Sequence, residues 1–249
     1  MPPTIAELFA SPDHYMHAFE GDAAVFVTMD RAAYRRSIFL DARIAPAIPE
    51  PIRVPLTPLV KANVPVNFIL PEVSAADSAA PAIFLYLGLR DYCLAILRSA
   101  PHRAWLRQVC GLLGSHLDRF DPASDGERAA ALWLAQVGRF AAALEAMPHA
   151  RSLDGERLLE HPAQTVTAAA SALDLPLTPG AIAAVRAGGL FATYSKRPGI
   201  AFDNAARLAR RREDEASLAG DIATAQAWLA AHRATATAAL AVIETRALG

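Results

Sequence analysis

The feature that most constrains the fold is an apolar run that meets a helical pattern at residues 82–98. The run from Ala82 to Leu87 is unbroken and rich in residues that favour strands. Such a short run predicts a strand buried on both faces. Gly88 interrupts the run, and the apolar residues that follow recur at helical spacing as far as Arg98. The stretch therefore predicts a strand, a tight turn and a helix.

The turn after this strand is also where a functional site is expected. Ligands of open α/β sheets bind at the carboxyl ends of the strands, and Arg90 and Asp91 are the charged residues there. Two roles are open for them. They form part of an anion site, or they make a cap or an ion pair at the start of the helix, where the helix dipole favours a carboxylate.

Most of the chain beyond Arg98 has a helical pattern, with apolar residues at intervals of three and four. Trp133 and Phe140 lie in one such stripe and are expected in the core. Leu153–Gly155 is predicted as a turn. The predicted helices are residues 101–120, 127–147, 162–173, 178–187 and about 213–247.

The first quarter of the chain is predicted to contain a strand at residues 23–29 and a short helix at 31–38. Six prolines between residues 44 and 65 exclude a helix there and predict an extended connector. Within this connector, Lys61 and Asn63 are expected at the end of a short strand. We expect the 249 residues to form a single domain.

Composition and charge narrow the function classes. The net charge of −1 and the isoelectric point near 6.7 give no electrostatic reason to expect nucleic acid or an anionic membrane as a partner. No stretch approaches the roughly 20 apolar residues that span a bilayer, and the first residues do not have the pattern of a signal peptide. The protein is therefore expected to be cytoplasmic.

The candidate metal ligands and thiols in the sequence have ordinary interpretations. His14 and His17 have a spacing that a helix would bring onto one face, but no third ligand follows nearby, so no metal site is expected. Cys93 and Cys110 both lie in apolar helical contexts and are expected to be reduced, partly buried thiols.

Short segments spread over nearly the whole chain have the order and spacing of a known family. They are residues 33–43, Val60–Asn63, residues 84–97, Leu153–Gly155, His161–Ala163, Tyr194–Lys196 and the helix that carries Trp228. Together they resemble a bacterial family of sulfotransferase-like proteins with the P-loop nucleotide-binding fold. The resemblance implies an α/β fold with a reduced P-loop-type parallel sheet of few strands, followed by a predominantly α-helical C-terminal two-thirds.

The chain departs from that family where the sulfate donor, 3′-phosphoadenosine phosphosulfate, would be held. The family has a strand and a Gly-Ser-Thr phosphate loop after the leader, whereas this chain runs from Arg43 through the proline connector to Lys61. That loop directs backbone N–H groups and a helix dipole at the donor. The family also holds the 3′-phosphate with an Arg and a Ser that flank an Asp. If Asp91 is that Asp, the flanking positions are Leu87 and Ala95, which cannot bind phosphate.

Several polar residues remain as a tentative anion site. Lys61 and Asn63 follow a predicted strand, and Lys196 with Arg197 resembles the basic loop that closes over the nucleotide in sulfotransferases. A solvated surface loop is an equally good interpretation of the second pair. The arginines between Arg207 and Arg212 are followed at once by acidic residues, which favours a solvated helix face over a phosphate site.

Three functional hypotheses follow, in order of preference. The first is a sulfotransferase-like protein without its phosphate loop, with no catalysis, no cofactor and a binding or accessory role. The second is a small-molecule transferase that uses 3′-phosphoadenosine phosphosulfate, an anion clamp of Lys61, Lys196 and Arg197, and His17 or His161 as base. The third is a helical protein-interaction module. The first and third predict a protein partner or a homo-oligomer that covers the exposed sheet.

Overall fold

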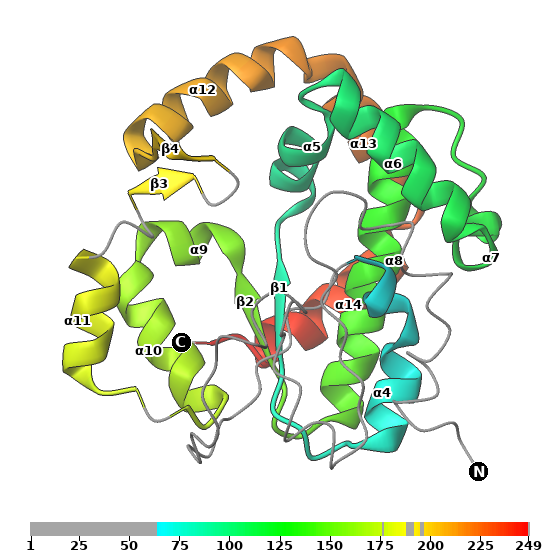
Figure 1. The fold of residues 1–249 in the computed structure, drawn as a ribbon. Helices are drawn as coiled ribbons and strands as arrows, with labels where there is room; N and C mark the ends of the chain where they lie inside the picture. Colours follow the sequence, from blue (N-terminus) through cyan, green and yellow to red (C-terminus); the bar gives the residue numbers. More distant parts are fainter. Residues whose placement is uncertain (1–63, 176, 188–191, 195–196, 249) are drawn as a thin grey trace, which may run out of the picture. The chain divides into compact units, whose positions relative to one another are not determined.

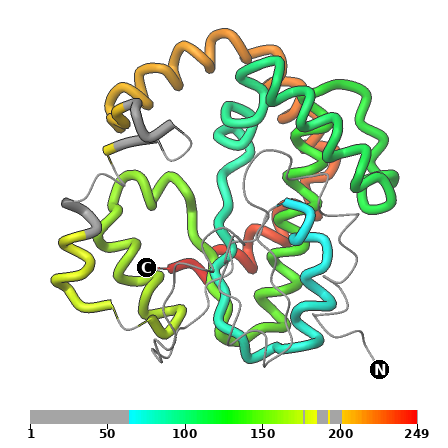
Figure 2. Tube along the Cα trace, viewed as in Figure 1, coloured from blue at the N-terminus to red at the C-terminus, as the bar shows by residue number. Residues whose placement is uncertain are grey.

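The computed structural model describes residues 64–248 except 176, 188–191 and 195–196, with side chains left undescribed at 185–187, 193–194 and 197–200. Figures 1 and 2 draw the other residues in grey. The predicted strand at 23–29, the helix at 31–38 and nearly all of the proline connector lie outside the described residues. The chain divides into two compact units, residues 1–78 and 79–249. The single domain stays a prediction.

The described part of the first unit is helical. A 3₁₀ helix, η3 (Val64–Ile69), continues directly into the helix α4 (Leu70–Ala76). Pro71 occupies the first turn of α4, where the missing N–H costs nothing because that N–H would have no partner within the helix. Phe68 and Leu70 are buried.

The second unit opens with the strand, turn and helix predicted from residues 82–98. The strand β1 (Ile83–Tyr86) is followed by Gly88 and the helix α5 (Leu89–Leu97). The remaining helices and strands of this unit are α6 (Ala100–Leu112), α7 (Gly114–Leu117), η4 (Asp118–Phe120), α8 (Asp125–Ala146), β2 (Arg151–Asp154), α9 (Gly155–Glu160), α10 (Pro162–Ala172), α11 (Pro179–Ala187), β3 (Thr193–Tyr194), β4 (Arg197–Ala201), α12 (Asn204–Ser217), α13 (Ala219–Ala231) and α14 (Arg233–Thr245).

The helix α8 is the centre of this unit, and α5, α6, α13 and α14 pack against it (Figure 1). Its start is fixed by a capping box, in which Ser124 and Glu127 each accept a hydrogen bond from the other's backbone N–H. Trp133 and Phe140 are 3% and 6% exposed, so their predicted place in the core is confirmed. Among the described residues, no helix is both long enough and apolar enough to cross a membrane.

Within the described residues the parallel sheet has two strands, and the second of them lies where the sequence predicts a turn. β1 and β2 pair in parallel, with Ile83 opposite Arg151 and Tyr86 opposite Asp154. The turn predicted at Leu153–Gly155 is therefore wrong, because two of its residues end a strand and the third begins α9. β3 and β4 form a separate antiparallel pair. The α/β class and the helical C-terminal part are confirmed at this coarse level.

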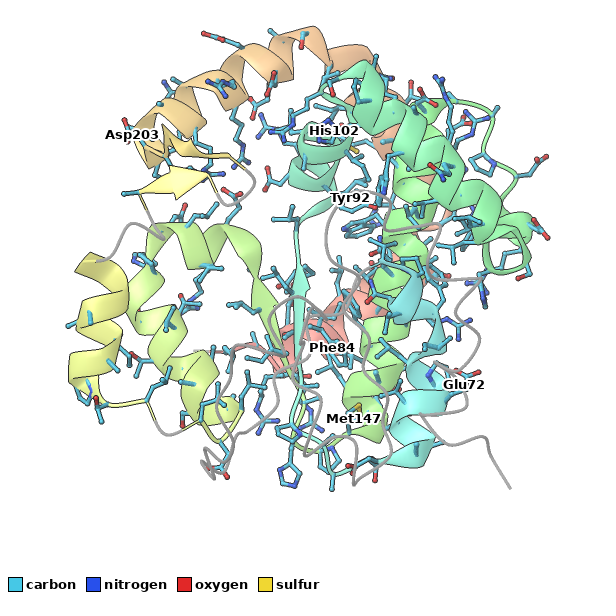
Figure 3. The ribbon with its side chains drawn as sticks, viewed as in Figure 1. Glu72, Phe84, Tyr92, His102, Met147 and Asp203 are labelled. Carbon is cyan, nitrogen blue, oxygen red and sulfur yellow. The ribbon has the colours of Figure 1, made fainter. Side chains whose placement is uncertain are left out.

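The prediction that β1 is buried on both faces is also wrong. Phe84, which Figure 3 labels, is buried. Its ring stacks on that of Phe140 of α8, with the ring centroids 5.1 Å apart. Leu85, which points to the opposite face, is 54% exposed. Alternate residues of a strand face opposite sides of the sheet, so within this unit the described helices cover the Phe84 face of β1, and Leu85 on the other face is exposed.

The single helix predicted at about 213–247 is divided into α12, α13 and α14, with breaks at Leu218 and His232. Both α13 and α14 pack on α8. A straight helix of that length would extend roughly 50 Å and would leave α8 after a few turns. The breaks change the direction of the chain, so that α13 and α14 both stay against α8 and bury Ile222 and Ile243 in the same core.

Candidate functional site

The carboxyl ends of β1 and β2 lie at one edge of the parallel sheet, and the charged residues of three helices meet there. β1 leads through Gly88 into α5, and β2 ends at Asp154, whose Oδ1 accepts a hydrogen bond of 2.9 Å from the Glu156 backbone N–H. A Cβ at Gly155 would lie 2.9 Å from Cδ2 of Leu87. The first turn of α9 is therefore packed directly against the end of β1.

The helix α12 contributes two arginines to this edge. Arg207 Nη1 and Nη2 donate to the two carboxylate oxygens of Glu156 at 2.9 and 3.0 Å. Arg211 Nη1 donates to Glu156 Oε2 at 2.8 Å. Three N–H groups from two guanidinium groups thus converge on one carboxylate.

The same helix holds both charged residues at the start of α5. Arg211 Nη2 donates to Asp91, and Arg90 pairs with Glu215 at 2.6 Å. Asp91 lies in the first turn of α5, where the helix dipole favours a carboxylate, and both Arg90 and Asp91 form ion pairs with α12. The carboxyl-edge cluster comprises six residues, namely Arg90, Asp91, Glu156, Arg207, Arg211 and Glu215.

Charge in the carboxyl-edge cluster is balanced, with three arginines and three carboxylates. Burial raises the pKa of Asp91, and the Arg211 guanidinium only partly offsets that effect. Burial acts to lower the pKa of Arg211, but the charges of Asp91 and Glu156 outweigh it and raise that pKa. The cluster therefore keeps Arg211 protonated more firmly than it keeps Asp91 ionised.

The structure brings together only two of the six predicted anion-site residues, Arg90 and Asp91. Lys61, Asn63 and Lys196 lie outside the described residues. Arg197 begins β4, and its side chain is not described. Of the two histidines considered as a base, His17 also lies outside, and His161 is exposed at the junction of α9 and α10.

Sequence reasoning missed Glu156 and misjudged the arginine run. The run from Arg207 to Arg212 was expected to form a solvated face, which holds for the exposed Arg210 and Arg212. It is wrong for Arg207 and Arg211, whose side chains are only 20% and 22% exposed and which pair with α9 and α5. The available signal was their spacing of four residues, which places both on one face of a helix.

A second cluster surrounds Asp125 at the start of α8. Its carboxylate accepts hydrogen bonds from Arg107 at 2.6 and 2.9 Å and from Arg128 at 3.2 Å. Arg103 reaches both Asp125 and Asp221 of α13. Hydrogen bonds from Arg107 are the main cause of a lowered pKa for Asp125. This cluster ties α6, α8 and α13 together, which is a structural role.

A hollow of about 630 Å³ lies beside that second cluster, and Cys110 is part of its lining. Burial raises the pKa of the Cys110 thiol to about 11 and that of Cys93 to about 12. Both cysteines are free, as the sequence predicts. They are protonated at neutral pH and are poor nucleophiles. Within the residues that the structure describes, no three His, Cys, Asp or Glu side chains gather as metal ligands.

Comparison with known proteins adds no assignment, since no family model, no curated protein and no solved structure matches this chain. The resemblance to sulfotransferase-like proteins remains an expectation from the sequence. The carboxyl-edge cluster is the arrangement on which a function can be argued.

Proposed function

We propose that this chain is a sulfotransferase-like protein that binds an anionic ligand at the carboxyl edge of its parallel sheet and does not transfer sulfate. The observation that carries the proposal is the carboxyl-edge cluster. It gathers two arginines of α12 at the edge where α/β proteins bind ligands, and it pairs them with the carboxylates of Asp91 and Glu156.

The pairing of these arginines argues against catalysis of sulfuryl transfer. Sulfuryl transfer, like phosphoryl transfer, depends on cations and backbone donors aimed at the charge of the transferred group. Arginines whose charge is already balanced by Glu156 and Asp91 supply little extra stabilisation to a transition state. The sequence also lacks the phosphate loop of the family that it resembles, and with it the usual concentration of N–H donors.

The alternative function, a small-molecule transferase, depends on residues outside the carboxyl-edge cluster. It depends on Lys61, Lys196 and Arg197 as an anion clamp and predicts that Lys196→Ala sharply weakens nucleotide binding. One experiment decides between the two functions, because both expect an anion site and only one expects a sulfated product.

The experiment combines binding and turnover on the full chain. Calorimetric titration with 3′-phosphoadenosine 5′-phosphate, at low and moderate salt, is expected to give binding that weakens as salt rises. Adenosine, which lacks the phosphates, is the control and should give no heat. Incubation with 3′-phosphoadenosine phosphosulfate and a phenolic acceptor should give no sulfated product. Product formation, or no binding even at about millimolar ligand, would contradict the proposed function.

A further inference from the structure

Glu156 occupies the fork formed by the guanidinium groups of Arg207 and Arg211, in the way that a bound anion would. The three N–H···O distances, 2.8, 2.9 and 3.0 Å, fall in the range of charge-assisted hydrogen bonds. Arg207 binds both oxygens of Glu156, and the planar guanidinium offers the same paired geometry to a phosphate or a sulfate. The fork is therefore suited to a tetrahedral oxyanion as well as to this carboxylate.

The fork is held in shape by contacts other than Glu156. Asn204 Oδ1 accepts from Arg207 Nε at 2.7 Å, which fixes the plane of that guanidinium. Arg211 is held independently by Asp91 and lies 3.5 Å from Glu215. Loss of the Glu156 charge would leave both arginines anchored, with three arginines facing two carboxylates in the carboxyl-edge cluster.

The helix that carries the fork is attached mainly through charge. In the part of the chain that the structure describes, α12 buries none of its side chains. Arg207 and Arg211 lie one turn apart on its inner face, whereas Arg210 and Arg212 are exposed. The two inner arginines can accept a different anion at Glu156's position without the loss of an apolar core.

We propose that Arg207 and Arg211 are the ligand-binding pair of the carboxyl edge, specific for a phosphate or sulfate group, and that Glu156 is an internal competitor that occupies the pair until such a group displaces it. This inference rests on the proposed function and names its residues and ligand class. Binding is then coupled to the release of Glu156, and the measured affinity is reduced by the fraction of molecules in which the fork is occupied.

The test is Glu156→Gln in the full chain, titrated calorimetrically with inorganic pyrophosphate and, separately, with sulfate. Removal of the competing charge is expected to tighten binding of at least one of the two by about tenfold or more. The ligand that gains more identifies the group for which the fork is built. Glu160→Gln, on the same helix with an exposed side chain, is the matched control and should leave both affinities unchanged. No gain for either ligand would overturn the inference.

A second variant tests whether the gain in anion affinity depends on the fork. Arg207→Gln in the Glu156→Gln background should abolish the gain, and a gain that survives this change would contradict the assignment. If Glu156→Gln lacks the native far-UV and near-UV spectra, Arg207→Gln in the otherwise native chain replaces it. That variant should bind pyrophosphate about fivefold or more weakly than the native chain, and equal binding would overturn the inference. Pyrophosphate carries no nucleoside and no sulfuryl group, so these outcomes are independent of the transfer assay.

Discussion

Gly126, in the first turn of α8, faces the backbone of α13 with no room for a methyl group. A Cβ at this position would lie 2.6 Å from the carbonyl oxygen of Asp221 and 3.3 Å from Cβ of Thr224. The first contact is with backbone, which cannot move aside as a flexible side chain can. The glycine therefore sets how closely the two helices approach at the Asp125 cluster.

Gly126→Ala is expected to lower the free energy of unfolding by about 1–3 kcal/mol, because the methyl group forces α13 away from α8. Urea denaturation followed by circular dichroism measures the change. Gly138→Ala, in the same helix, is the matched control, since a Cβ there meets nothing within 4 Å. That control should stabilise the protein by roughly 0.5–1 kcal/mol through helix propensity. A loss of similar size at both positions would contradict the packing argument.

Asp125 links stability to acid pH. Hydrogen bonds from Arg107, opposed in part by burial, lower the pKa of Asp125 below its ordinary value of 3.8. A lowered folded-state pKa contributes stability that is present above the unfolded pKa and is lost as the pH falls through the folded pKa. The free energy of unfolding is therefore expected to fall with pH below about 4.

Asp125→Asn removes this titration, so its unfolding free energy should change less between about pH 5 and 2 than that of the native chain. At neutral pH the variant should be less stable by about 1–3 kcal/mol, because three arginines lose a charged acceptor. Asp118→Asn, at an exposed position of η4, is the control, and its unfolding free energy should depend on pH as that of the native chain does. If the unfolding free energy falls with pH equally in the native chain and in Asp125→Asn, another group causes the loss of stability at acid pH and the prediction is contradicted.

At the scale of elements, α12 is the helix whose attachment depends most on ion pairs, because none of its described side chains is buried. Its links to α9 and α5 run through Arg207, Arg211 and Glu215, each between 20% and 24% exposed. Charges that reach solvent are weakened by salt, whose screening length falls from about 10 Å at 0.1 M to about 3 Å at 1 M.

We expect the amides of α12 to exchange with solvent deuterium several-fold faster at about 1 M than at about 0.05 M sodium chloride. The amides of α8 should be unaffected at the same salt concentrations, because its attachment is mostly apolar. Hydrogen exchange read by mass spectrometry resolves the two helices. Exchange of α12 that does not respond to salt would mean that backbone and apolar contacts hold it.

Elements with strong periodic patterns could be predicted from the sequence, and elements defined by their partners could not. The succession of β1 and α5 along the chain and the apolar stripe of α8 could both be predicted from local patterns. β2 is Arg-Ser-Leu-Asp, which has little strand character and becomes a strand because β1 lies beside it. The breaks at Leu218 and His232 similarly arise from packing of α13 and α14 on one helix.

In the candidate site too, some residues could be predicted from the sequence and others could not. Arg90 and Asp91 could be located because the end of a strand is recognisable in the sequence. Their partners could not, since Arg211 lies 120 residues from Asp91 and Arg207 lies 51 residues from Glu156. Only the fold brings such residues together. A charge run in a sequence therefore indicates a solvated face only until the elements opposite it are known.

At the scale of the whole molecule, the second unit contains the main described core. α8 supplies Leu132 and Leu144, both fully buried, and α14 supplies the fully buried Ile243. Ser152 of β2 donates to the Ile243 carbonyl oxygen at 2.6 Å, which ties the sheet to the last helix. These contacts all lie within residues 79–249. The core of this unit is therefore closed by its own last helix.

A chain that begins at Ala79 is expected to fold alone, with a single cooperative urea transition and a helical far-UV spectrum, because its core is internal to residues 79–249. A chain that begins at Leu89 is the control. It lacks β1 and the buried Phe84, so it should lose the cooperative transition. If the Ala79 chain instead shows a broad transition and binds an apolar dye, residues 1–78 complete its core and the single-domain prediction holds. A sharp transition would mean that the carboxyl-edge cluster can be studied on the second unit alone.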